Sequence, residues 1–329
     1  MLSWSRHTDD RSDGAGGGVV VPPRPAPRRP VVGLALGAGA ARGWAHLGVI
    51  AELAAHDIQV DVVAGTSIGA IVGACLVTDK LPELEEFARS LTKRRVIGYM
   101  DWSLSGTGLI GGRRLRELLD KHMGHMRVED APKRFATVAT EVGSGHEIWL
   151  TRGDMVSAVC ASYALPGVFE PVKFAGRWLM DGALVNPVPV TVCRALGADC
   201  VIAVNLVGDM LYRGTVIADP GAELTVEDIV QEAPPPRGRW PFGALRLGFG
   251  RRSDGPQGLM ATMMDAFNIT QDRISRSRLA GDPPDVMLNL RVPQIGLFDF
   301  HRADELIEAG RETVRRSLHN LLEHVSAVG

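Results

Sequence analysis

Ser67 stands in the sequence GTSIG, which has the G-x-S-x-G spacing of a nucleophilic serine. A short apolar run over residues 60–64 precedes it, and an apolar helical pattern follows it. In a sharp strand-to-helix turn, Gly65 and Gly69 leave room for the serine, and the turn lifts its hydroxyl clear of the sheet. The spacing predicts a serine that attacks acyl groups. In the alternative interpretation, Ser67 only caps the following helix.

Asp181 is the residue that we expect to accept the proton of that serine. It follows the predicted strand Arg177–Met180 and precedes Gly182. A serine hydroxyl needs a proton acceptor within hydrogen-bond reach, and an aspartate at the end of a strand can supply one. The Asp-Gly pair also favours a plain β-turn. Asn186, a little farther along, is either a hydrogen-bonding partner of this site or a helix cap.

A second glycine-rich turn, GAGAARG at residues 37–43, follows the apolar run Val31–Leu36. It could bind a dinucleotide, but Arg42 stands where that fingerprint needs a small residue, and Asp61 begins the second strand instead of ending it. The other interpretation is an oxyanion hole, in which backbone N–H groups stabilise a developing negative charge. The residues concerned are Gly39, Ala40, Ala41 and Arg42. The Arg42 side chain is expected either in solvent or paired with an acid or an anionic substrate group.

Both turns connect an apolar strand pattern to a helix pattern, so two strand–turn–helix units follow each other between residues 31 and 77. Such units place parallel strands side by side, which predicts an α/β fold with both turns at the same edge of the sheet. Residues 106–112 are expected to form a flexible connection. Further strands are expected at 135–141, 147–150, 177–180, 200–206 and 286–290, and further helices at 81–91, 113–123, 259–279 and 302–322.

The segments LGAGAARGWAH and GTSIG, followed later by Asp181-Gly182-Ala183, resemble the patatin-like phospholipase family, in particular its bacterial, neuropathy-target-esterase-like branch. The resemblance covers about residues 31–206. It implies a three-layer α/β/α fold with a central, mostly parallel sheet. It also implies a dyad of Ser67 and Asp181 without a histidine. The implied activity is hydrolysis of lipid acyl esters, of the phospholipase or lysophospholipase type, without a metal or organic cofactor.

The resemblance places the family's oxyanion loop on residues 38–43. Ala38 and Ala40 stand there in place of glycines. The backbone N–H donors survive this change, but alanine adopts a positive φ less readily than glycine.

Two other functions stay open at the level of the sequence. One is an α/β-hydrolase esterase with the triad Ser67, Asp181 and His301, which stand in the right chain order. The other is a non-catalytic adaptor that keeps the fold without turnover. Loss of a cellular role in a Ser67→Ala variant would distinguish an enzyme from such an adaptor.

The composition fits an ordinary globular protein: 329 residues, 45 % of them hydrophobic, with a formal net charge of −2. Because basic residues are not in excess, nucleic acid is not the expected partner, and the resemblance implies a lipid substrate instead. The four cysteines lie in apolar segments without C-x-x-C spacing, which favours reduced thiols and a cytoplasmic location. His122 and His125 have no third ligand near them in the sequence, so no metal site is expected.

We expect one domain over residues 31–329 after a disordered tail at 1–30, which lacks the apolar region of a signal peptide. Residues 209–258 are expected to be a lid or flexible insert. Its part Arg237–Arg252 mixes arginines with aromatic residues, which suits peripheral contact with a membrane but also fits plain disorder. The methionine-rich side of the helix at 259–279 is either core or part of an acyl-chain groove.

Overall fold

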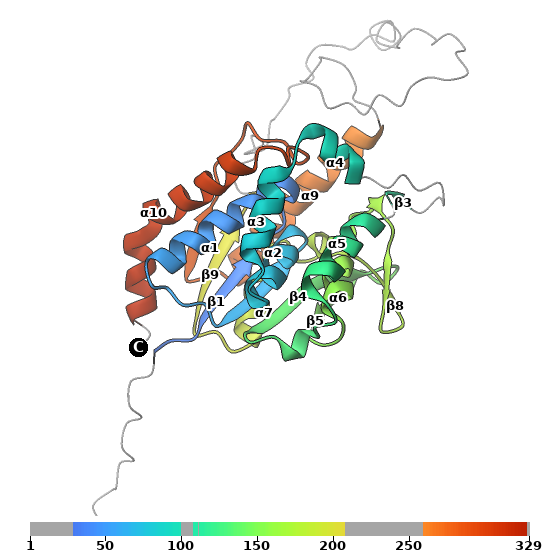
Figure 1. The fold of residues 1–329 in the computed structure, drawn as a ribbon. Helices are drawn as coiled ribbons and strands as arrows, with labels where there is room; N and C mark the ends of the chain where they lie inside the picture. The colour runs from blue at the N-terminus through green and yellow to red at the C-terminus, as the bar shows by residue number, and fades with distance from the viewer. Residues whose placement is uncertain (1–28, 100–107, 111, 208–258, 328–329) are drawn as a thin grey trace, which may run out of the picture.

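The computed structural model describes residues 29–99, 108–110, 112–207 and 259–327. The tail expected at 1–30 lies almost wholly outside the described residues, and the insert expected at 209–258 lies entirely outside them. The described part is built around an eight-stranded sheet with helices on both of its faces (Figure 1).

The strands of this sheet lie in the order β10-β9-β1-β2-β4-β8-β7, and β5 pairs with β4 outside that path. β10, β9, β1, β2 and β4 pair in parallel, whereas β5, β7 and β8 pair antiparallel. The sheet is therefore mostly parallel, as the sequence predicts. The bounds are β1 (Val32–Leu36), β2 (Val62–Thr66), β4 (Arg134–Glu141), β5 (Glu147–Leu150), β7 (Val172–Phe174), β8 (Arg177–Asp181), β9 (Cys200–Asn205) and β10 (Val286–Asn289).

Helices cover the sheet in two layers, which confirms the three-layer α/β/α fold. α1 (Ala45–Ala55), α2 (Ile68–Val77) and α10 (Ala303–Ala327) pack on one face, and α7 (Val190–Ala195) packs on the other. The remaining helices are α3 (Leu81–Ser90), α4 (Lys93–Tyr99), α5 (Arg113–Met123), α6 (Met155–Tyr163) and α9 (Leu259–Gly281), with short 3₁₀ helices η1 (Ala40–Trp44), η2 (Val128–Asp130) and η3 (Gly182–Leu184).

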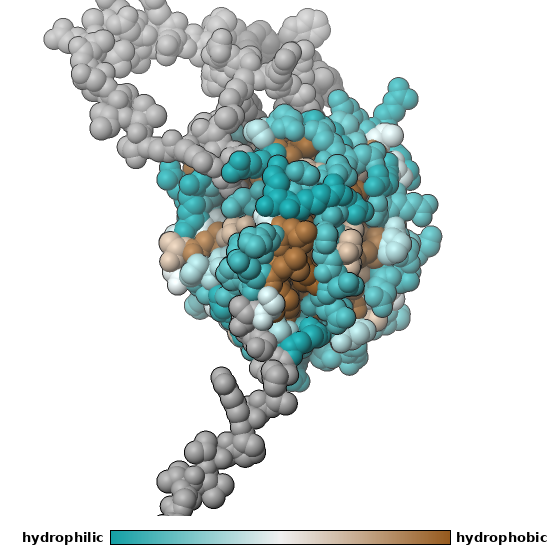
Figure 2. Space-filling view, turned by 90° about the vertical axis from the view of Figure 1, so that its left-hand side faces the viewer, coloured by the Kyte–Doolittle hydropathy of each residue, from teal (hydrophilic) through white to brown (hydrophobic). Residues whose placement is uncertain are grey.

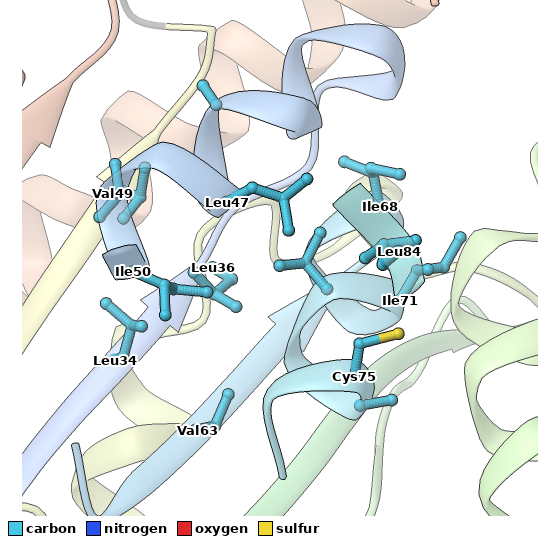
Figure 3. Close-up of a cluster of buried hydrophobic side chains, with 14 of the residues drawn as sticks. Leu34, Leu36, Leu47, Val49, Ile50, Val63, Ile68, Ile71, Cys75 and Leu84 are labelled. Atoms are coloured by element: carbon cyan, nitrogen blue, oxygen red, sulfur yellow. The ribbon is translucent and has the colours of Figure 1, made fainter. Parts of the chain in front are cut away.

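The core between the sheet and α1 and α2 fixes the strand ends from which both glycine turns start. On β1, Leu34 and Leu36 face this layer while Ala35 faces α7, because alternate residues of a strand point to opposite faces. Figure 3 shows the aliphatic side chains that meet here: Leu34, Leu36, Leu47, Val49, Ile50, Val63, Ile68, Ile71 and Leu84, with the thiol of Cys75.

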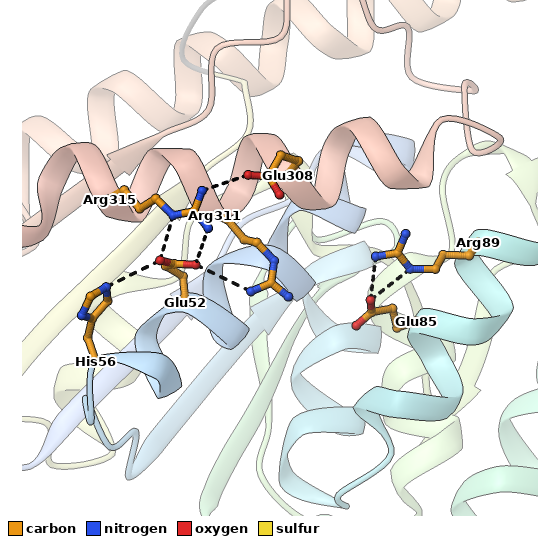
Figure 4. A network of polar contacts seen from close by, with 7 residues as sticks. All are labelled: Glu52, His56, Glu85, Arg89, Glu308, Arg311 and Arg315. Carbon is orange, nitrogen blue, oxygen red and sulfur yellow. Dashed lines mark hydrogen bonds and ion pairs between the residues drawn. The ribbon is translucent and has the colours of Figure 1, made fainter.

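A buried carboxylate joins α10 to α1. Glu52 on α1 is 6 % exposed and accepts hydrogen bonds from Nε and Nη2 of Arg315 at 2.9 and 3.1 Å (Figure 4). Arg311 and His56 lie 3.6 and 3.5 Å from the same carboxylate. The hydrogen bond from Arg315 is the main cause of the lowered pKa of Glu52, which stays charged. These contacts fix α10 to the helix that follows the first glycine turn.

The structure corrects the sequence analysis in two local details. β2 ends at Thr66, later than expected, so that Ser67 follows the strand directly. The connection expected to be flexible at 106–112 contains β3 (Gly108–Ile110), which pairs in parallel with β6 (Gly167–Phe169) in a second small sheet. The pairing partner lies far along the chain, so a local glycine content could not indicate this strand.

Seen from the side on which α10 lies, the surface is mainly hydrophilic around a hydrophobic strip (Figure 2). Among the described residues, no helix is long and apolar enough to cross a lipid bilayer. The four cysteines are free thiols, and each is buried.

Candidate active site

Ser67 lies between β2 and α2 in a backbone conformation that is rare for a residue with a side chain, with φ 58° and ψ −123°. Its hydroxyl makes no capping hydrogen bond to α2. Instead, Oγ donates a hydrogen bond of 2.6 Å to Oδ2 of Asp181. The sharp turn thus directs the hydroxyl to a carboxylate that comes from another strand.

The glycines on either side of Ser67 are required by close backbone approach. A Cβ on Gly65 would lie 2.4 Å from the carbonyl oxygen of Gly69. A Cβ on Gly69 would lie 2.1 Å from the carbonyl oxygen of Leu36, at the end of β1. Both distances are far below van der Waals contact. Gly69 therefore lets α2 sit directly against β1.

Asp181 ends β8 and is 1 % exposed. Its Oδ1 accepts a hydrogen bond of 2.8 Å from the N–H of Ala183, while its backbone N–H donates to the carbonyl of Ala164 at 2.9 Å. Its backbone carbonyl accepts 2.8 Å from the hydroxyl of Thr140 on β4. Both carboxyl oxygens thus have donors, and the backbone is fixed from two directions.

Burial raises the pKa of Asp181 to about 7, and the hydrogen bonds from Ser67 and Ala183 oppose that rise. An aspartate in water has a pKa of about 3.9 and is a weak base at neutral pH. The raised pKa makes Asp181 a better proton acceptor while leaving much of it ionised at pH 7.

The sequence did not predict two hydroxyl groups near the turn, those of Ser162 and Thr66. The N–H of Ser67 donates to Oγ of Ser162 at 3.0 Å, and Ser162 donates to the carbonyl of Val138 at 2.6 Å. Thr66 donates to the carbonyl of Asn186 at 2.9 Å. Ser162 stands within an apolar helix pattern. A single serine in such a pattern is a weak indication of a buried hydroxyl with a hydrogen-bonding role.

Asn186 is buried and does not cap α7; it meets its neighbours through its backbone carbonyl, which accepts from Thr66, and through its side chain. Its Nδ2 donates to Oε1 of Glu147 at 2.7 Å rather than to Asp181. The cap position of α7 is occupied by Pro189 instead. Glu147 is also paired with Arg278 of α9, so this chain of contacts joins the segment after Asp181 to α9.

The first glycine turn lies beside Ser67, and its N–H groups are not equally available. Ala41 donates its N–H to the carbonyl of Leu297 at 2.9 Å, and Arg42 donates to that of Gly39 at 3.2 Å. Gly39 and Ala40 line the same cavity as Ser67. Ala40 has φ 49°, so the positive φ that alanine resists falls on this residue.

The side chain of Arg42 is held by the protein. Its Nε and Nη2 donate to the carbonyl of Ile295 at 3.0 and 2.9 Å. Burial lowers the pKa of Arg42, and the nearby carboxylate of Asp299 acts in the opposite direction. The sequence left open whether this side chain is in solvent or paired with an acid or an anionic substrate group. In the structure it is half-buried and connects the turn to residues 295–299.

An apolar cavity of about 210 Å³ is lined by Ser67, Asp181, Gly39 and Ala40. Most of its remaining wall is hydrophobic and comes from several helices, with Ile71, Leu84, Leu119, Phe169, Phe267 and Phe300 among the lining side chains. The arrangement places a serine–carboxylate pair and two residues of the first glycine turn beside a space that suits an alkyl chain.

Among the described side chains, Met263 and Met264 of the methionine-rich side of α9 do not line this cavity. Met264 is 7 % exposed and packs in a small cluster with Val168, while Met263 is 42 % exposed. α9 instead lines the cavity through Phe267, Asn268 and Gln271.

The histidines that the structure describes differ in where they lie relative to the site of Ser67 and Asp181. His301 is half-buried and does not line the cavity. His46 is fully buried, with Nε2 2.8 Å from the carbonyl oxygen of Gly37, and burial lowers its pKa to about 4. His122 lines the cavity away from any metal-type cluster: in the part of the chain that the structure describes, no three His, Cys, Asp or Glu side chains are grouped to hold a metal ion.

The chain is similar to a protein-family model and to several known proteins. Residues 34–194 match the family model described as patatin-like phospholipase. An uncharacterized NTE family protein of Mycobacterium tuberculosis is 30 % identical, over 88 % of this chain and 91 % of that protein. The neuropathy target esterase sws of Drosophila melanogaster is 32 % identical, over 53 % of this chain and 13 % of that protein. The crystal structure of VipD from Legionella pneumophila matches with a TM-score of 0.44 and 14 % identity, over 91 % of this chain and 67 % of that one.

Proposed function

The chain belongs to the patatin-like phospholipase family, in its NTE branch, and from this premise we propose that it cleaves lipid acyl esters with Ser67 as nucleophile and Asp181 as base. Family membership itself indicates a lipid hydrolase. The observation that carries the more specific proposal is the 2.6 Å hydrogen bond from Ser67 Oγ to Asp181 Oδ2 at the wall of an apolar cavity. The substrate class that fits is a phospholipid or lysophospholipid ester.

In the first half-reaction, Oγ of Ser67 attacks the ester carbonyl and transfers its proton to Oδ2 of Asp181. The carbonyl oxygen becomes an oxyanion, and the N–H groups of Gly39 and Ala40 are the donors proposed to stabilise it. The tetrahedral intermediate then collapses: the bond to the alcohol breaks, and Asp181 returns the proton to the leaving oxygen. The acyl group remains on Ser67 as an ester.

In the second half-reaction, a water molecule attacks the acyl-enzyme, and Asp181 takes one of its protons. The second intermediate collapses to a free fatty acid, and the proton returns to Oγ of Ser67. The cycle uses the same carboxyl group as base and acid, which suits a group whose pKa burial raises to about 7. We expect kcat/KM to rise between about pH 6 and 8, as Asp181 loses its proton.

A fluorophosphonate probe and a panel of lipid esters test this proposal. The probe should label Ser67, and Ser67→Ala and Asp181→Asn should each lower ester hydrolysis roughly 10³-fold or more with the fold intact. His301→Ala is the control that separates the dyad from the triad, and it should keep most of the rate. Equal loss of activity in His301→Ala and Ser67→Ala, with both proteins folded, would replace the dyad by the triad.

A membrane surface is the proposed source of the substrate, with the protein in the cytoplasm and bound peripherally. The support comes from the sequence of Arg237–Arg252, which lies outside the described residues, and from the free buried cysteines. Anionic vesicles should bind the protein, less strongly at high salt. A variant without this segment should bind less but still hydrolyse a short soluble ester. Equal vesicle binding by both proteins would argue against contact through this segment.

A further inference from the structure

From Asn268 to Ser275 the buried side of α9 is polar. Asn268, Gln271 and Ser275 lie at the helical spacing i, i+3 and i+7 and are 8, 3 and 2 % exposed. Helices α1 and α2, in contrast, bury mainly aliphatic side chains. Because a buried polar group destabilises a protein unless it forms a hydrogen bond, the stripe on α9 requires partners.

The side-chain oxygen of Asn268 lacks one among the residues that the structure describes. Its Oδ1 is inaccessible to solvent and accepts no hydrogen bond there. Asn268 and Gln271 line the cavity that Ser67 and Asp181 also line. The catalytic pair does not use these amides, because Asp181 accepts its side-chain hydrogen bonds from Ser67 and Ala183. Two carboxamides therefore border the space that a substrate would fill.

The surrounding chemistry favours a neutral group as their ligand. Lys80, the lysine of the described lining, is already paired with Glu83 at 2.9 Å, so it offers little to an anion. A hydroxyl both donates and accepts hydrogen bonds. It therefore satisfies Asn268 in either orientation of the terminal amide.

We propose that Asn268, together with Gln271, binds a hydroxyl group of the ester substrate inside the cavity, so that hydroxylated esters are preferred to their plain analogues. This inference rests on the function proposed above. The hydroxyl belongs either to the alcohol part, as in a monoacylglycerol, or to the acyl chain, as in a hydroxy fatty acid. In both cases Asn268 gains in the complex the hydrogen bond that it lacks in the free protein.

Two matched pairs of esters distinguish these sources. The first pair is a monoacylglycerol and its dimethyl ether, and the second is a hydroxyacyl and a plain acyl ester of one chromogenic alcohol. In one of the two pairs, the one that carries the bound hydroxyl, the wild-type protein should favour the hydroxylated member at least about fivefold in kcat/KM. Asn268→Leu, of similar volume, should reduce that ratio to about one. It should also raise Tm, because it removes a buried amide oxygen that has no partner, whereas replacing an amide with a purely structural role would lower Tm.

Ile269→Leu is the matched control: this neighbour on α9 is 47 % exposed, and both its ratio and its Tm should equal those of the wild type. Asn268→Ala replaces the leucine variant if that protein does not fold. Equal rates within both pairs in the wild type, or a preference that persists without Asn268, would overturn the inference. If no ester is cleaved and Ser67 is not labelled, the proposed function fails by itself. Calorimetry of Ser67→Ala with both pairs of esters then decides the inference, since equal affinities within both pairs refute it.

Discussion

The two glycine turns of the candidate site follow neighbouring parallel strands, yet they are held in different ways. In the turn of residues 65–69 the constraint is close backbone packing, because a Cβ on Gly65 would meet the carbonyl of Gly69, and a Cβ on Gly69 would meet the carbonyl of Leu36 at the end of the neighbouring strand. The turn of residues 37–42 is held from a distance. Its N–H groups donate to carbonyls of segments far along the chain, at Val204, Pro187 and Leu297.

This difference shows which parts of the sequence position the nucleophile and which position the proposed oxyanion donors. The position of the nucleophile is set within five residues and by the strand beside it. The position of the proposed oxyanion donors depends on the end of β9, the segment before α7 and the segment before α10. The two turns meet where Gly69 packs on the carbonyl of Leu36, so damage to the local turn also reaches the other one.

The largest effect should follow from Gly69→Ala. The added Cβ would lie 2.1 Å from the carbonyl oxygen of Leu36 and 2.9 Å from that of Gly37, and backbone cannot yield as a side chain can. We expect a loss of about 3 kcal/mol or more in the free energy of unfolding, measured with urea. Gly281→Ala is the control, since a Cβ there meets nothing within 4 Å. A Gly69→Ala protein as stable as the control would show that the turn is less constrained than its geometry implies.

Asp181→Asn should give the next largest effect, and it should be stabilising. Burial raises the pKa of Asp181 from 3.8 to about 7, so the folded protein binds more protons than the unfolded one between these values. The wild type therefore loses stability as pH rises through this window and no further above it. Asparagine avoids that loss, so we expect a gain of about 2 kcal/mol at pH 8 that vanishes near pH 4.

Urea unfolding of both proteins at the two pH values measures this gain, alongside the lost activity. An asparagine variant that is less stable than the wild type at pH 8 would contradict the raised pKa. The expected result is that the carboxylate of the site is kept for chemistry at the expense of stability.

The same distinction explains what could be predicted from the sequence. The α/β fold and the positions of Ser67 and Asp181 follow from local patterns of strand, glycine and helix. The hydroxyl of Ser162 that supports Ser67 and the carbonyl of Leu297 that holds the first turn lie far away in sequence. No local spacing indicates such partners, because the sheet brings them together only after folding. Even Asn186, correctly expected near the site, could not be assigned its bond to Glu147.

Arg42→Leu should have a moderate effect that is specific to the first turn. The variant loses two charge-assisted hydrogen bonds to the carbonyl of Ile295, which we expect to cost about 1.5 kcal/mol of stability. The rate of ester hydrolysis should fall roughly tenfold as the oxyanion donors shift. A fluorophosphonate should still label Ser67, because the second turn is held locally. Arg42→Lys should fall between the two proteins, since an ammonium lacks the planar fork of arginine. Loss of labelling in Arg42→Leu would mean that the two turns are not separable.

The smallest and most discriminating effect comes from restoring glycine at each alanine of the first turn. Ala40 has φ 49°, a conformation that costs an L-residue roughly 1 kcal/mol, whereas Ala38 has no positive φ. Each alanine-to-glycine change also lowers stability by about 0.4–1 kcal/mol through the added freedom of the unfolded chain. In Ala40→Gly the two terms nearly cancel, so stability should stay within about 0.5 kcal/mol of the wild type. Ala38→Gly gains no relief and also loses a buried methyl, so it should be less stable than Ala40→Gly by about 1 kcal/mol. Urea unfolding of the two variants measures that difference directly. Equal losses in both would show that Ala40 is not strained, and that the distant anchors of this turn, not its glycines, already set its shape.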